Sequence, residues 1–151
     1  MRHARVTGGP LTAHFQDDFA ILNRRNGYAL RLNVQHRFVV RQTDGPRGPW
    51  TVSSVEYVYE VADERDDPIA AWHWHPASAL PGDAAHWPHL HAYGARDTLT
   101  LHKLHLPTGR VAIEAIVRFL IADLDVAPRR ADWSTLLDRH EAAFRQQRSW
   151  A

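Results

Sequence analysis

Histidines recur at alternate positions in two short segments near the middle of the chain. One segment contains His73 and His75, and the other contains His89 and His91. Side chains at positions i and i+2 of a β-strand lie on the same face of that strand. If the two segments are neighbouring antiparallel strands, opposed side chains approach to about 5 Å, and the four imidazoles form one cluster.

Such a cluster can catalyse proton transfer at neutral pH, because imidazole is both a good base and, once protonated, a good acid. With a cation to stabilise the developing charge, two histidines cleave RNA without a cofactor, since the 2′-hydroxyl supplies the nucleophile. Our first hypothesis is therefore a metal-independent ribonuclease. Its expected catalytic residues are His73, His75, His89 and His91, assisted by Lys103 and His105.

Two alternatives stay open. The first is a metal-binding protein or metallohydrolase, in which zinc or another divalent transition metal is bound by His73, His75 and His91. The chain contains no cysteine, so thiolate ligands are excluded. The second is a non-catalytic protein whose histidines bond to one another and whose apolar helices form a dimer or partner interface.

Arginines on the first long strand are candidates for binding a phosphate backbone. Arg31, Arg37 and Arg41 share the polar face of the alternating segment 28–41, and Arg110 follows the histidine segments. The first fifty residues contain 8 Lys and Arg against 3 Asp and Glu, although the whole chain has a net charge of only +1. A local basic face is thus compatible with an RNA partner.

The bulk composition is that of an ordinary globular domain. A length of 151 residues with 44% hydrophobic residues predicts one domain over residues 1–151. No apolar run approaches the roughly 20 residues that cross a bilayer, and the N-terminus shows no apolar signal segment. We therefore expect a cytoplasmic protein with no membrane contact.

Period-two patterns predict strands over 28–41, 52–61, 69–75, 88–93 and 98–106, with a hairpin tip at the acidic run 63–68. Apolar residues at helical spacing predict helices over 112–124 and 133–144, the second capped by Asp132. A further short helix is expected after Thr12, because Phe15, Phe19 and Leu22 also recur at helical spacing. The predicted fold is α+β, with an antiparallel sheet followed by two C-terminal helices packed on it.

The segment Tyr57-Val58-Tyr59, the strand from Ile69 into the first histidine pair, and Pro88-His89-Leu90-His91 together resemble small prokaryotic proteins related to the TumE-like toxins of toxin–antitoxin modules. The resemblance covers about residues 55–122. The resemblance implies a cytoplasmic protein that acts on RNA and is inhibited by an antitoxin protein.

Overall fold

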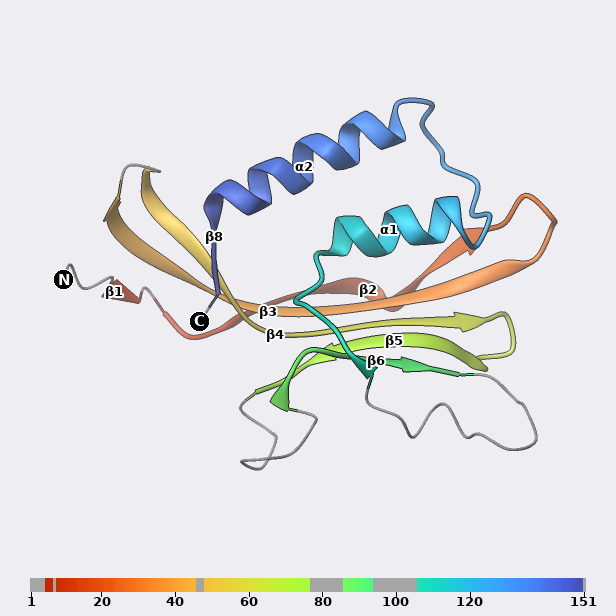
Figure 1. Cartoon of the computed structure of the whole chain (residues 1–151), viewed down its shortest axis with the longest axis horizontal. Helices are drawn as coiled ribbons and strands as arrows, with labels where there is room; N and C mark the ends of the chain where they lie inside the picture. The colour runs from red at the N-terminus through yellow and green to blue at the C-terminus, as the bar shows by residue number, and fades with distance from the viewer. Residues whose placement is uncertain (1–4, 7, 46–47, 77–85, 94–105, 151) are drawn as a thin grey trace.

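The computed structural model describes residues 5–6, 8–45, 48–76, 86–93 and 106–150 of the chain. Within these ranges, eight strands form one sheet and two helices lie on the same side of it (Figure 1). The strands are β1 (Arg5–Val6), β2 (Leu11–Asn23), β3 (Ala29–Gly45), β4 (Gly48–Asp63), β5 (Pro68–Trp74), β6 (His89–Ala92), β7 (Leu106–Pro107) and β8 (Arg148–Trp150). The helices are α1 (Ile113–Ala122) and α2 (Trp133–Gln147). The predicted α+β class is confirmed.

The sheet is built around the long hairpin of β3 and β4. β2 pairs with the outer edge of β3, while β5, β6 and β7 follow β4 in that order, and all of these pairings are antiparallel. β8 instead pairs in parallel with β4 beside Val52, Ser53 and Ser54. This strand was not predicted, because three residues after a helix are too few to show a period. The predicted strand over 98–106 falls almost entirely outside the described residues.

The helix predicted after Thr12 is wrong, because these residues form β2. The pairing of β2 with β3 shifts between His14 and Phe19, where Asp18 adopts a left-handed conformation with φ 63°. A bulge of this kind resets the alternation of a strand. Phe15 and Leu22 therefore both pack against the core, although seven residues separate them. Because of this bulge, the core-facing residues of β2 have a spacing that is typical of a helix.

The core lies between the helices and one face of the central strands. Tyr57 and Tyr59 on β4 are buried and stacked, with ring centroids 4.8 Å apart. Trp74 on β5 packs beside them, and Ile116 and Leu120 cover them from α1. Large-area burial of this kind is the main favourable contribution to folding. The residues that alternate with the core positions on β4 and β5 must therefore face away from the helices.

The two helices begin and end close to the predicted positions. α1 ends at Ala122, where the Asp123 N–H donates to the Phe119 carbonyl, and Asp125 then turns the chain with φ 59°. The carboxylate of Asp132, the predicted cap of α2, instead accepts two hydrogen bonds from Arg130 at 2.9 and 2.8 Å. In the described part of the chain, neither helix has the length and apolar character that crossing a membrane requires.

A buried polar network lies beside the stacked tyrosines. Nε2 of His36 lies 2.7 Å from the Ser54 hydroxyl, and Nδ1 of His36 lies 3.1 Å from the Tyr59 hydroxyl. Burial lowers the pKa of His36 below its ordinary value of 6.5, because desolvation disfavours the charged ring. Partial burial thus favours the neutral form of the ring.

We expect this histidine to make the protein less stable in acid. The unfolded chain takes up a proton at His36 near pH 6.5, whereas the folded chain does so only at lower pH, so the free energy of unfolding decreases as the pH falls below about 6.5. Urea denaturation at about pH 8 and about pH 5 should show a smaller loss for His36→Gln than for the wild type. The exposed His140 supplies the control, since His140→Gln should behave like the wild type. An equal loss in His36→Gln and the wild type would contradict the assignment.

Candidate metal centre

The pairing of β5 with β6 brings the two histidine segments together. His73 lies directly opposite His89, and Ala71 lies opposite His91. His73 also pairs with Val58 on β4, whereas the neighbouring Trp74 pairs with the core residue Tyr57. Opposed residues of an antiparallel pair share a face, so the histidines occupy the face of the sheet that is turned away from the helices.

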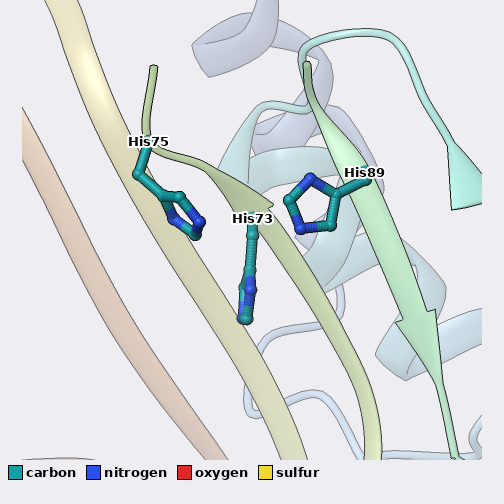
Figure 2. Close-up of side chains that lie close together, drawn as sticks. All are labelled: His73, His75 and His89. Atoms are coloured by element: carbon teal, nitrogen blue, oxygen red, sulfur yellow. The ribbon is translucent and has the colours of Figure 1, made fainter. Parts of the chain in front are cut away.

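The rings of His73, His75 and His89 converge. One ligand nitrogen from each lies within 4.8 Å of the other two. The rings of His75 and His89 approach each other from either side of His73, with the helices behind the strands (Figure 2). Their burial differs, because His89 is only 1% exposed while the other two are half-buried. The cluster is therefore most deeply buried at β6 and less deeply buried at β5.

The spacing of these three rings suits a shared metal ion. Their centroids lie 5.5 Å apart for His73 and His75, 5.6 Å for His73 and His89, and 5.7 Å for His75 and His89. Histidine nitrogens bind zinc at about 2.0–2.1 Å, and tetrahedral angles then place the ring centroids roughly 5 Å apart. Small rotations of the rings would bring the three nitrogens to a common ion.

A backbone hydrogen bond fixes the orientation of His89. Its Nδ1 lies 2.7 Å from the carbonyl oxygen of Trp87. A carbonyl only accepts hydrogen bonds, so Nδ1 carries the proton and Nε2 carries the lone pair in the neutral ring. Metal-binding histidines commonly donate their second nitrogen in this way, which holds the ring in place and raises its basicity.

His91, Tyr93 and Glu60 extend the cluster along the same face. The ring of His91 lies 5.0 Å from that of His73 and 4.9 Å from that of His89, and Tyr93 follows it at 6.4 Å. Glu60 lies opposite Ala71, whose small side chain separates it from the row of His91. Partial burial raises the pKa of the Tyr93 hydroxyl, and the negative charge of Glu60 raises it further. A phenol hydroxyl and a carboxylate therefore lie on the same face as the imidazoles.

Two further predicted catalytic residues, Lys103 and His105, lie outside the described residues. Arg31 pairs with Asp66 and lies over the Phe19 ring at 4.6 Å. Among the other members of the predicted basic set, Arg37 pairs with Glu56 at 2.8 Å, Arg41 is half-buried, and Arg110 lies over the Trp74 ring at 4.1 Å. Two of the three strand arginines that were predicted to bind a phosphate backbone, Arg31 and Arg37, are thus paired with carboxylates.

Glu60 and Tyr93 were not among the predicted site residues, although the period of the segment 87–93 places Tyr93 on the same face as His89 and His91. Glu60 alternates with the aromatic residues of β4, and Tyr93 continues the alternation of His89 and His91, so the same period-two argument applies to both. Their proximity depends on the order of β4, β5 and β6 in the sheet. That order is a property of the whole fold rather than of any one segment.

An apolar cavity on the helical side of the sheet is a different kind of site. It has a volume of ≈ 470 Å³ and lies between β2, α1 and α2, with a lining that includes Leu22, Val117, Trp133 and Leu137. Arg129 and Arg130 are its charged lining residues. The described residues around it include no histidine or carboxylate, so acid–base or metal chemistry is assigned to the histidine face instead.

Comparison with known proteins gives no family for the chain, since no family model, curated protein or solved structure matches it. The resemblance to TumE-like toxins therefore stays a prediction. The function must be argued from the arrangement of the chain's own residues.

The burial of the three histidines predicts how each tolerates substitution. His89→Ala would leave the carbonyl of Trp87 without its donor and a cavity in place of the buried ring. We therefore expect a loss of about 1–3 kcal/mol in the free energy of unfolding. His75→Ala, at a half-buried position at the end of β5, should cost about 1 kcal/mol or less. Urea denaturation measures both values, and equal losses would contradict this order.

Proposed function

We propose that the protein is a histidine-ligated metallohydrolase whose divalent transition metal is bound by His73, His75 and His89. The observation that carries this proposal is the convergence of their ligand nitrogens within 4.8 Å. Zinc is the first candidate ion, because it accepts imidazole readily and the chain offers no thiolate.

Three protein ligands favour a catalytic role over a purely structural one. Structural zinc sites generally use four protein ligands, whereas catalytic sites use three and keep one position for water or substrate. An ion held in this way supplies Lewis acidity and lowers the pKa of water to about 7. His73 and His75 are only half-buried, whereas His89 is fully buried.

The neighbouring residues would then handle protons. His91 lies beside two of the three proposed ligands, but it is not a member of the set whose nitrogens all lie within 4.8 Å. We assign His91 the role of general acid and base. Tyr93 and Glu60 are the next polar groups on the same face. A neutral imidazole within reach of the reacting group is a suitable base at neutral pH.

Metal binding by protein purified without a histidine tag tests the centre. Isothermal titration with zinc should show one tight site in the wild type, and His75→Ala should bind at least about 100-fold more weakly because it lacks a direct ligand. His75 is the better choice for this test, since His89 also supports the fold.

The matched control is His140→Ala on the exposed surface of α2, which should bind zinc like the wild type. Addition of a chelator should release the ion from the wild type. If the wild type and His75→Ala bind zinc equally, or neither binds it, the metal centre does not exist.

A second candidate function is favoured by the closeness of His91 to two other rings. Rings 4.9 and 5.0 Å apart can supply an acid and a base to one substrate without any metal. This corresponds to the metal-independent ribonuclease of a toxin–antitoxin module, with RNA as substrate and an antitoxin protein as partner.

The two candidates predict opposite responses to chelation. The metallohydrolase should cleave an activated phosphodiester such as bis(p-nitrophenyl) phosphate only with zinc, and His91→Ala should lower kcat by about 100-fold or more while zinc binding persists. The metal-independent ribonuclease should cleave RNA equally well in excess chelator. Chelator-resistant cleavage that depends on His91 would replace the first candidate with the second.

A further inference from the structure

A small slot lies where β5 ends and β6 begins. It has a volume of ≈ 200 Å³, below the roughly 300–1,000 Å³ of pockets that enclose a drug-sized ligand, so it suits a single flat ring system. Its lining is almost entirely planar or rigid: Trp74, Pro76, His86, Trp87, Pro88 and Arg110.

Two aromatic surfaces define the slot. Trp87 is 68% exposed, the most exposed of the large hydrophobic side chains that the structure describes. The ring of His86 stands at 89° to it, with centroids 5.6 Å apart. Trp87 thus offers an open indole face, and exposed aromatic rings of this kind stack on bases in proteins that bind single-stranded nucleic acid.

Two polar side chains line the slot, those of His86 and Arg110. Nδ1 of His86 is buried and has no hydrogen-bond partner in the described part of the chain. The guanidinium carbon of Arg110 lies 4.1 Å from the centroid of the Trp74 ring, and guanidinium N–H groups are well suited to binding phosphate.

The slot adjoins the proposed metal centre along the chain. Pro76 directly follows His75, and Pro88 directly precedes His89. The Trp87 carbonyl that orients His89 belongs to the residue whose ring lines the slot. The ring of Trp74 lies on the core face of β5, whereas the three proposed ligands lie on the opposite face, so the slot and the metal centre are linked through the backbone at the end of this strand pair.

We propose that this slot binds the base of a nucleotide, with Trp87 stacking on the ring and Arg110 binding the phosphate. The inference goes beyond the proposed function, because it concerns the residues of the slot and none of the proposed metal ligands. The same chemistry is offered by a free nucleotide and by one unit of a single RNA strand.

Binding to metal-free protein tests the slot separately from the metal centre. Isothermal titration should show adenosine monophosphate binding about tenfold or more tightly than ribose 5-phosphate or adenosine, since each of these lacks one of the two recognised groups. Trp87→Ala should weaken the binding of adenosine monophosphate by about tenfold or more. Its exposed position means that the variant should fold. Arg110→Lys should weaken the binding of the nucleotide but not that of adenosine.

Trp50→Ala is the matched control, because Trp50 is 48% exposed but lies near the tip of the β3–β4 hairpin. It should bind the nucleotide like the wild type. A short oligoadenylate that binds more tightly than the mononucleotide identifies an RNA strand as the source, and equal affinity identifies the free nucleotide. If ribose 5-phosphate binds as tightly as adenosine monophosphate, or if Trp87→Ala binds like the wild type, the slot does not recognise a base.

Discussion

The antiparallel pairing of β5 with β6 is the constraint on which the site depends. It places His73 opposite His89 and, through the alternation of strand residues, directs both away from the core that buries Trp74. A shift of this pairing by one residue would exchange the faces and carry imidazoles into the apolar core. The aromatic packing on one face therefore specifies the position of the histidines on the other.

Chain segments at the end of this strand pair serve more than one role. The short stretch from His86 to His89 contributes a partly unsatisfied imidazole, an exposed indole, a carbonyl that orients a ring, and a buried ligand. The other side of the slot comes from Trp74 and Pro76, beside the ligand His75. Pro76 follows one histidine pair and Pro88 precedes the other, and a proline has no backbone N–H to donate within a sheet.

Much of this arrangement could be predicted from the sequence, because it depends on local periods. The faces of β5 and of the first part of β3, the hairpin at 63–68 and the two helices follow from alternation and from helical spacing, whereas the pairing of β3 with β4 shifts after Arg37 and buries Val39, which the alternation had placed on the polar face. The convergence of the histidine pairs follows as well, once β5 and β6 are taken as neighbours. The errors have equally local causes. The bulge at Asp18 gave β2 an apparent helical period, and β8 was too short to show one. The role of Glu60 depends on long-range strand order, and the carboxylates that pair with Arg31 and Arg37 come from distant positions in the sequence.

Anomalous diffraction from crystals soaked with zinc tests the central claim most directly. The account predicts one strong peak on the face of the sheet opposite α1, with Nε2 of His89 and one ring nitrogen each from His73 and His75 at about 2.0–2.1 Å from the ion. The Nδ1 of His89 should still donate to the carbonyl of Trp87. A zinc-soaked crystal with no peak between these three rings, or with the rings turned apart, would contradict it.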